Sequence, residues 1–158
     1  FNMKVQPLCP LLKSSLEAIQ TYGAERQVAL TLNCPTDDFQ VCVDDQRLMQ
    51  VVANMLSNAI KFSPDGGTVT VDVKSKGGMV EVSVEDKGPG IPDAFRTRIF
   101  QKFAQADASD SRVNEGTGLG LAIAREMLLR MKGSIDYQST LGEGTRFYFD
   151  LPLHQPED

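Results

Sequence analysis

Residues 115–127 combine three glycines with a strong helical pattern, and this combination restricts the fold more than any other stretch of the chain. Gly116, Gly118 and Gly120 stand where a helix is expected to begin, although glycine destabilises a helix interior by about 1 kcal/mol relative to alanine. One explanation for these glycines is that the start of the helix binds an anion. The first turn of a helix presents unpaired N–H groups and the positive end of the helix dipole, which phosphate reaches where no Cβ intervenes. A glycine-rich turn that only connects two elements is the alternative, and this stretch alone does not decide between them.

The composition indicates one globular domain. The chain has 158 residues, 41% of them hydrophobic, which is enough for one hydrophobic core and cramped for two. The formal net charge of −5 and the lack of a Lys/Arg run argue against a nucleic-acid surface. No apolar stretch approaches the roughly 20 residues that a membrane span needs, so we expect these residues to make no membrane contact.

The cysteines suggest no structural framework. Cys9, Cys34 and Cys42 form no CxxC pair and have no neighbouring histidine, so the pattern suggests neither a zinc site nor a set of disulfides. We therefore expect free thiols and a cytoplasmic location, whether or not the parent protein is anchored in a membrane. Because the sequence begins at Phe1 without an initiator Met, we interpret it as part of a longer protein.

Hydrophobic periodicity predicts a mixture of helices and strands. Helices are expected at residues 11–22, at residues 45–62 after a cap from Asp44 or Asp45, in a short segment ending near Phe103, and from the glycines to about Met131. Strands are expected at residues 28–32, 39–43, 68–74, 79–85, 135–138 and 145–151. A polar stretch without periodicity precedes Glu115, and we interpret it as a mobile loop. Antiparallel pairs with helices in separate runs indicate an α+β, two-layer sandwich.

The long central helix carries a polar row beside its apolar stripe. At about 100° per residue, Asn54, Asn58 and Lys61 fall on one face. A solvated surface is the usual explanation of such a row. Its place beside the stripe also suits the wall of a pocket, where an Asn oxygen is a suitable ligand for Mg²⁺ and Lys61 could neutralise phosphate.

Two polar residues take positions that strand alternation assigns to the core. Asp86 has the parity of Val80, Val82 and Val84, and Thr145 likewise begins a row of inward apolar residues. A buried carboxylate needs donors, which the neighbouring backbone or an amino-bearing ligand could supply. The glycines at 88 and 90 follow Asp86, as if the backbone had to make room for something flat. A capped turn after a strand is the alternative.

Together, these motifs resemble the catalytic, ATP-binding domain of bacterial sensor histidine kinases, members of the GHKL ATPase superfamily. "NMLSNAIKF" resembles the N box, "DKGPG" the G1 box, "IFQKF" the F box, "GTGLGLA" the G2 box and "GEGTRF" the last glycine box. The resemblance covers residues 28–152, with the motifs in the family's order. It implies a Bergerat-type two-layer α/β sandwich, in which a mixed, mostly antiparallel sheet packs against three main helices and a flexible lid covers ATP.

The resemblance also implies roles for individual residues. Asp86 would accept a hydrogen bond from the adenine amino group with support from Thr145, and Asn58 would bind Mg²⁺. The implied catalytic residues are Asn54, Lys61 and Arg112, the last of these as a γ-phosphate partner in the lid. The implied nucleotide-binding residues are Asn54, Asn58, Lys61, Phe62, Asp86, Gly88, Gly90, Ile91, Phe103, Gly116, Thr117, Gly118, Leu119, Gly120, Leu121 and Thr145.

Residue 54 bears on the reaction. In superfamily members that hydrolyse ATP the equivalent residue is commonly a glutamate that activates water, and asparagine is no general base near neutral pH. The resemblance therefore implies transfer of the γ-phosphoryl group to a histidine, by positioning and charge neutralisation. The single histidine, His154, lies in a polar tail without the context of a family phosphoacceptor, so we expect the acceptor outside this chain.

The resemblance implies an organisation and partners. Residues 1–22 would form the junction from an upstream dimerisation and phosphoacceptor domain, residues 23–153 the ATP-binding domain, and residues 154–158 a frayed tail. A response-regulator receiver domain would act downstream, and the stretch "IFQKFAQADASDSR" is similar to lids of hybrid kinases. We expect this chain to be a monomer and its parent a homodimer.

Two alternative functions stay open. One is a degenerate module that binds nucleotide weakly or acts through protein contacts. The other is a GHKL serine kinase or hydrolysing ATPase.

Overall fold

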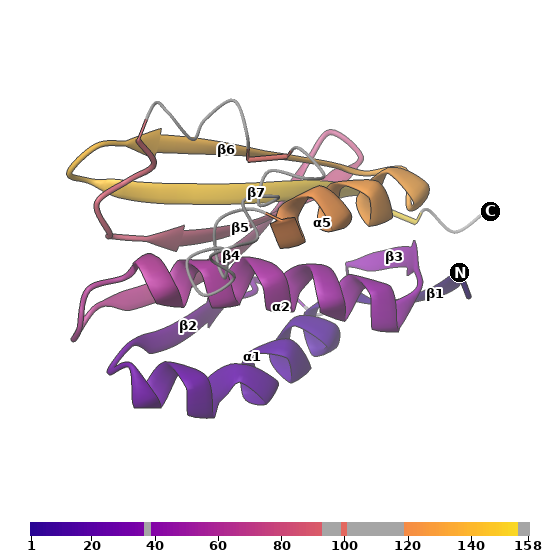
Figure 1. The fold of residues 1–158 in the computed structure, drawn as a ribbon. Coiled ribbons are helices and arrows are strands. Elements are labelled where there is room, and N and C mark those ends of the chain that lie inside the picture. The colour runs from indigo at the N-terminus through magenta and orange to yellow at the C-terminus, as the bar shows by residue number, and fades with distance from the viewer. Residues whose placement is uncertain (37–38, 93–98, 101–118, 155–158) are drawn as a thin grey trace.

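The computed structural model describes residues 1–36, 39–92, 99–100 and 119–154. Along the chain the elements are β1 (Lys4–Pro7), α1 (Leu8–Glu25), β2 (Ala29–Asn33), β3 (Gln40–Val43), α2 (Asp45–Phe62), β4 (Thr68–Lys76), β5 (Met79–Asp86), α5 (Leu119–Arg130), β6 (Ser134–Thr140) and β7 (Gly144–Pro152). Helices α1, α2 and α5 form one layer and the main sheet forms the other (Figure 1). None of the helices in these ranges has the length and hydropathy of a membrane-crossing segment.

The main sheet is mixed and mostly antiparallel. Its five strands lie in the order β2-β4-β5-β7-β6, with β2 parallel to β4 and every other neighbouring pair antiparallel. Strands β1 and β3 form a separate antiparallel pair, which contacts the main sheet through a bridge between Val41 and Leu153. The predicted two-layer sandwich is therefore confirmed, and the strands expected at residues 28–32 and 39–43 exist but belong to different sheets.

Local sequence explains where the first two helices begin and end. Helix α1 begins at Leu8, three residues earlier than expected, because Pro10 lies in the first turn, where a backbone N–H has no intrahelical partner. Helix α2 begins after Asp44, whose Oδ1 accepts a hydrogen bond from the Arg47 N–H at 3.1 Å, and it ends before Ser63 and Pro64. The prediction for this helix is confirmed.

The hydrophobic core fills the space between the two layers. Helix α2 contributes seven buried apolar side chains, and β4, β5 and β7 each turn every second residue towards them. Helix α1 contributes Leu8, Leu12 and Leu16 to the same core. Residues 8–22, expected to form part of a junction, are therefore packed into the body of the domain.

The cysteine expectation is wrong for two of the three residues. Cys9, in the first turn of α1, and Cys34, just after β2, form a disulfide with their Cα atoms 6.4 Å apart. Cys42 is a free, exposed thiol. Sequence spacing gave no indication of this pair because tertiary structure creates it. After helix α1 the chain reverses direction, and strand β2 runs back beside the helix, so the end of the strand lies near the start of the helix (Figure 1).

Reduction of this disulfide should destabilise the fold. The two cysteines are 25 residues apart, and closing a loop of this size stabilises a protein by about 3 kcal/mol in the chain-entropy account. Thermal melts with and without dithiothreitol should differ by about 6–12 °C. The Cys42→Ala variant should keep this difference, and the Cys9→Ser/Cys34→Ser variant should lose it. Identical melting temperatures for the wild type in both buffers would contradict the disulfide's role.

Candidate functional site

Asp86 and Thr145 lie opposite each other at the ends of two paired strands. Asp86 is the last residue of β5, and its register partner in the antiparallel β5–β7 pair is Thr145. Both belong to the inward rows of their strands, and their exposed fractions are 3% and 5%. The burial that strand alternation predicted for these two polar residues is therefore confirmed.

The Asp86 carboxylate is held by backbone donors. Its Oδ1 accepts a hydrogen bond from the Gly88 N–H at 2.8 Å, and the Thr145 backbone N–H also hydrogen-bonds to it. Burial nevertheless raises the pKa of Asp86 above its ordinary value of 3.8, because desolvation outweighs these two hydrogen bonds. An ionised carboxylate has about four acceptor positions, so this group retains capacity for a further donor.

The glycines of the segment after β5 meet other parts of the chain. A Cβ on Gly88 would collide with the carbonyl oxygen of Phe62 at the end of α2. Gly90 has a φ of +84°, and a Cβ there would lie 2.7 Å from the Thr140 carbonyl oxygen. The protein's own packing thus requires both glycines. The capped-turn alternative accounts for them, and space for a flat group is not needed to explain them.

Ser139 is a site residue that sequence reasoning missed. It lies in β6 opposite Thr145, with its Oγ 3.0 Å from Thr145 Oγ1. The same oxygen accepts a hydrogen bond from the Ile91 N–H at 2.7 Å and lies 3.3 Å from the Gly144 carbonyl oxygen. Ser139 has the inward parity of Ile135, which is the pattern that drew attention to Asp86, so the same test applied to β6 would have found it.

The polar row of α2 lies near the end of the helix that packs against the segment after Asp86. Asn58 is buried, with 5% of its surface exposed, whereas Asn54 and Lys61 are half-buried. Phe62 is 40% exposed, and its carbonyl group packs against Gly88. The structure therefore brings the C-terminal end of α2 beside the segment that follows Asp86.

Only part of the glycine-rich motif falls within the described residues. Helix α5 is described over Leu119–Arg130, which includes Gly120 and the buried Leu121, so the last part of the motif is helical. The other predicted site residues, Phe103, Arg112, Gly116, Thr117 and Gly118, lie outside the described residues. Their roles, and the choice between an anion site and a connecting turn, stay predictions.

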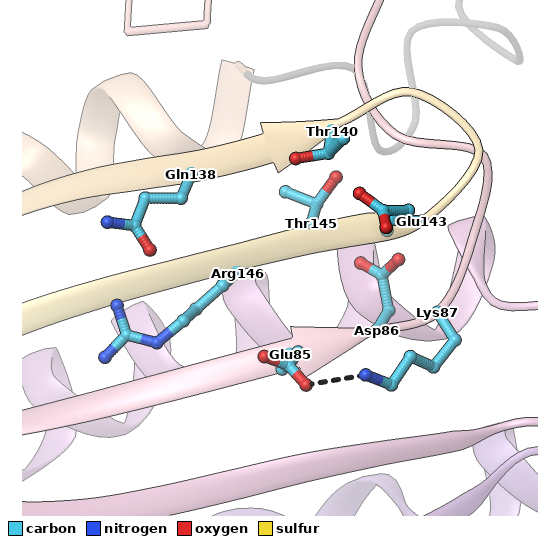
Figure 2. Close-up of a pocket in the computed structure, with 9 residues that line it drawn as sticks. Glu85, Asp86, Lys87, Gln138, Thr140, Glu143, Thr145 and Arg146 are labelled. Atoms are coloured by element: carbon cyan, nitrogen blue, oxygen red, sulfur yellow. Dashed lines mark hydrogen bonds and ion pairs between the residues drawn. The ribbon is translucent and has the colours of Figure 1, made fainter.

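A polar hollow of about 220 Å³ opens where β5 and β6 end and β7 begins (Figure 2). It is smaller than the ~300–1,000 Å³ of a typical ligand pocket. Glu85 and Lys87 form an ion pair on its wall, 3.1 Å between Nζ and Oε1. The lining residues are Glu85, Asp86, Lys87, Gln138, Thr140, Glu143, Gly144, Thr145 and Arg146.

The donor chemistry fits a magnesium ion that arrives with a ligand. Within the described ranges, no group of three or more His, Cys, Asp or Glu side chains could hold a metal ion. Asn58 offers a carboxamide oxygen, and Mg²⁺ usually takes few protein ligands, keeping water and substrate phosphate oxygens. These residues thus suit a phosphate-bound Mg²⁺ better than a resident ion.

Comparison with known proteins identifies the family. The family described as "Histidine kinase-, DNA gyrase B-, and HSP90-like ATPase" matches residues 43–155. The chain belongs to this ATPase family. It is 39% identical over 136 residues to the sensor histidine kinase WalK of Bacillus subtilis, covering 85% of this chain and 22% of WalK. It is 37% identical over 151 residues to the signal transduction histidine-protein kinase BarA of Escherichia coli K12, covering 90% of this chain and 16% of BarA. The chain therefore spans about a fifth of these relatives.

Solved structures agree with this assignment. The nucleotide-free catalytic domain of histidine kinase ThkA has the same fold, with a TM-score of 0.81, 24% identity and 97% of each chain covered. Full-length ShkA in complex with AMPPNP also gives a TM-score of 0.81, at 29% identity over all of this chain and 33% of ShkA. The resemblance to histidine kinase catalytic domains is confirmed.

The raised pKa of Asp86 predicts a pH dependence of stability. Because the folded state favours the protonated carboxyl, its contribution to the free energy of unfolding is largest below pH 3.8 and falls as the pH rises through the raised pKa. Urea unfolding of the wild type and the Asp86→Asn variant, from about pH 3 to pH 7, isolates this contribution. The free energy of unfolding of the wild type minus that of Asp86→Asn should decrease as the pH rises. An increase with pH would contradict the raised pKa of Asp86.

Proposed function

We propose that the chain is the ATP-binding catalytic domain of a two-component sensor histidine kinase. It transfers the γ-phosphoryl group of Mg-ATP to a histidine outside these residues. The observation that carries this proposal is the buried Asp86 carboxylate, opposite Thr145, in a member of an ATPase family whose similar relatives are named histidine kinases. In the two alternatives, a serine kinase would transfer the phosphoryl group to a serine, and a degenerate module would transfer it to no acceptor.

Asp86 reads the base in this proposal. Its carboxylate accepts a hydrogen bond from the exocyclic amino group of adenine, while the Gly88 and Thr145 backbone donors hold it in place. Since a buried charge without partners is costly, an amino group is a better occupant of the remaining acceptor positions than an apolar group. Ile91 and Leu121, which are partly and fully buried, supply apolar surface for the base.

The α2 row handles the phosphates. Asn58 would hold Mg²⁺, which when bound neutralises charge on the phosphate oxygens, and Lys61 adds a cation on the same helix face. The N–H groups at the start of α5, together with Gly116, Thr117 and Gly118, would bind phosphate oxygens. Asn54 cannot take a proton from water near neutral pH, so it orients the reacting groups and disfavours hydrolysis. Arg112 is proposed as the γ-phosphate partner.

The partners are also proposed. ThkA has been solved in complex with the response regulator protein TrrA, which supports a receiver domain as the downstream partner here. Residues 1–22 lead from the upstream dimerisation and phosphoacceptor domain while packing into this domain, and residues 154–158 form a tail. We propose a monomeric chain, a homodimeric parent and a cytoplasmic location, where the Cys9–Cys34 disulfide would be exposed to reduction.

Asp86→Asn should weaken nucleotide binding. Losing a buried, charged hydrogen bond costs about 1–3 kcal/mol, so the Kd for ADP, measured by calorimetry with Mg²⁺, should rise about 5–150-fold. Asp136→Asn is the matched control, because Asp136 is an exposed carboxylate that also accepts a bond from a neighbouring backbone N–H. Its affinity should equal that of the wild type. Equal affinities for Asp86→Asn and the control would sink the adenine assignment.

Asn58→Ala should remove the effect of magnesium. We expect Mg²⁺ to raise the affinity of the wild type for ADP, and the variant to lose most of this rise because it lacks the carboxamide ligand. The control is Asn33→Ala, which removes an exposed asparagine bonded to Asp72 on β4. Two titrations of each protein, with Mg²⁺ and with a chelator, give the comparison. A variant that keeps the wild-type response would contradict the metal assignment.

A further inference from the structure

We propose that Ser139 is a positioning residue for recognition of the base, acting through Thr145 and Ile91. The inference rests on the proposed function, since it concerns the same site. It assigns a role to a residue for which the motifs of the sequence gave none.

The three side chains form a row across three strands. Asp86 is the register partner of Thr145 across β5 and β7, and Thr145 is the partner of Ser139 across β7 and β6. Neighbouring strands are about 4.8 Å apart, so these residues follow one another along the inward face. The 3.0 Å contact between the two hydroxyl oxygens joins the second pair directly.

Ser139 also holds the segment that covers Asp86. The Ile91 N–H donates to Ser139 Oγ at 2.7 Å, and the Gly142 N–H donates to the Pro89 carbonyl oxygen at 2.9 Å. These two bonds fix the segment against the β6–β7 hairpin. The same segment supplies the Gly88 N–H that holds the Asp86 carboxylate. Ser139 is therefore linked indirectly to the Asp86 carboxylate in two ways, through Thr145 and through the backbone of residues 88–91.

The hydroxyl of Ser139 limits how the Thr145 hydroxyl can be oriented. Ser139 Oγ accepts a hydrogen bond from the Ile91 N–H, and among its contacts with the described residues its own proton can go to the Gly144 carbonyl oxygen at 3.3 Å or to Thr145 Oγ1 at 3.0 Å. If the proton goes to Gly144, Thr145 donates to Ser139 and presents only acceptor positions to the site. If it goes to Thr145, the Thr145 proton is directed elsewhere. Removing the Ser139 hydroxyl releases this constraint.

A purely structural role predicts a different result from a positioning role. A serine that only stabilises the hairpin would, when removed, weaken binding of every nucleotide to the same degree. A serine that orients the groups reading the base would, when removed, reduce the preference for adenine. Inosine diphosphate (IDP) separates the two cases, because its base carries a carbonyl group where adenine carries the amino group.

The experiment is a calorimetric comparison of ADP and IDP, both with Mg²⁺. We expect the wild type to prefer ADP. Ser139→Ala should lower the affinity for ADP about 3–10-fold, the range for one hydrogen bond, and leave that for IDP nearly unchanged. Ser139→Thr, which keeps the hydroxyl, should restore the preference. In a Thr145→Val background, Ser139→Ala should have a smaller effect than in the wild type, because the two act together.

Ser134→Ala is the matched control. Ser134 lies in the same strand on the outward face, where its Oγ donates to Asp150 Oδ1 at 2.8 Å. This variant loses one serine hydrogen bond from β6 and leaves the contacts of Asp86, Thr145 and Ser139 unchanged. Its affinities for ADP and IDP should equal those of the wild type.

Each outcome decides the proposal. An equal loss of ADP and IDP binding in Ser139→Ala overturns it in favour of a structural role. If Ser139→Ala does not fold, Ser139→Cys, a weaker hydrogen-bonding group of similar size, should give an intermediate preference, and an unchanged one overturns the proposal. If Asp86→Asn abolishes the preference and Ser139→Ala keeps it, the proposed function stands and the role of Ser139 does not. A wild type without preference contradicts the adenine assignment, and the role of Ser139 with it.

Discussion

The buried carboxylate of Asp86 is the constraint on which the rest of the site depends. A charge removed from water at the end of a strand requires donors at defined positions, and the chain supplies them from the segment after β5 and from β7. Desolvation still outweighs these donors and raises the pKa of the carboxyl. A group held in this way is pre-organised to accept one more hydrogen bond, which explains why a polar residue occupies a position that would otherwise be apolar.

Close backbone packing connects this carboxylate to the helix layer. Gly88 lets the segment after β5 approach the carbonyl group of Phe62, so the last turn of α2 is placed relative to Asp86 by contact between main chains. Helix α2 also carries Asn58 and Lys61. The distance between the group that would read the base and the groups that would meet the phosphates is therefore set by backbone, which is stiffer than side-chain contact. At Gly90 a positive φ lets the same segment approach the backbone of the β6–β7 hairpin closely.

Periodic features of the fold could be predicted from sequence, and non-periodic ones could not. Strand alternation correctly predicted that Asp86 and Thr145 are buried, and helical spacing with the Asp44 cap correctly predicted helix α2. The Cys9–Cys34 disulfide, the assignment of β2 and β3 to different sheets, and the β2–β4 parallel pairing depend on how distant segments meet, which no local pattern contains. Ser139 was missed because the strand expected at residues 135–138 stops one residue before it, whereas β6 extends to Thr140.

Backbone amide chemical shifts, followed while the wild-type chain is titrated with ADP and Mg²⁺, test the central claim most directly. The account predicts the largest changes at Gly88 and Thr145, which hold the Asp86 carboxylate, and at Ile91, which binds Ser139, with small changes at outward residues of β6 such as Asp136. Saturating ADP that shifts none of these three amides, or shifts outward residues instead, would contradict the claim that this carboxylate lies at the centre of a nucleotide site.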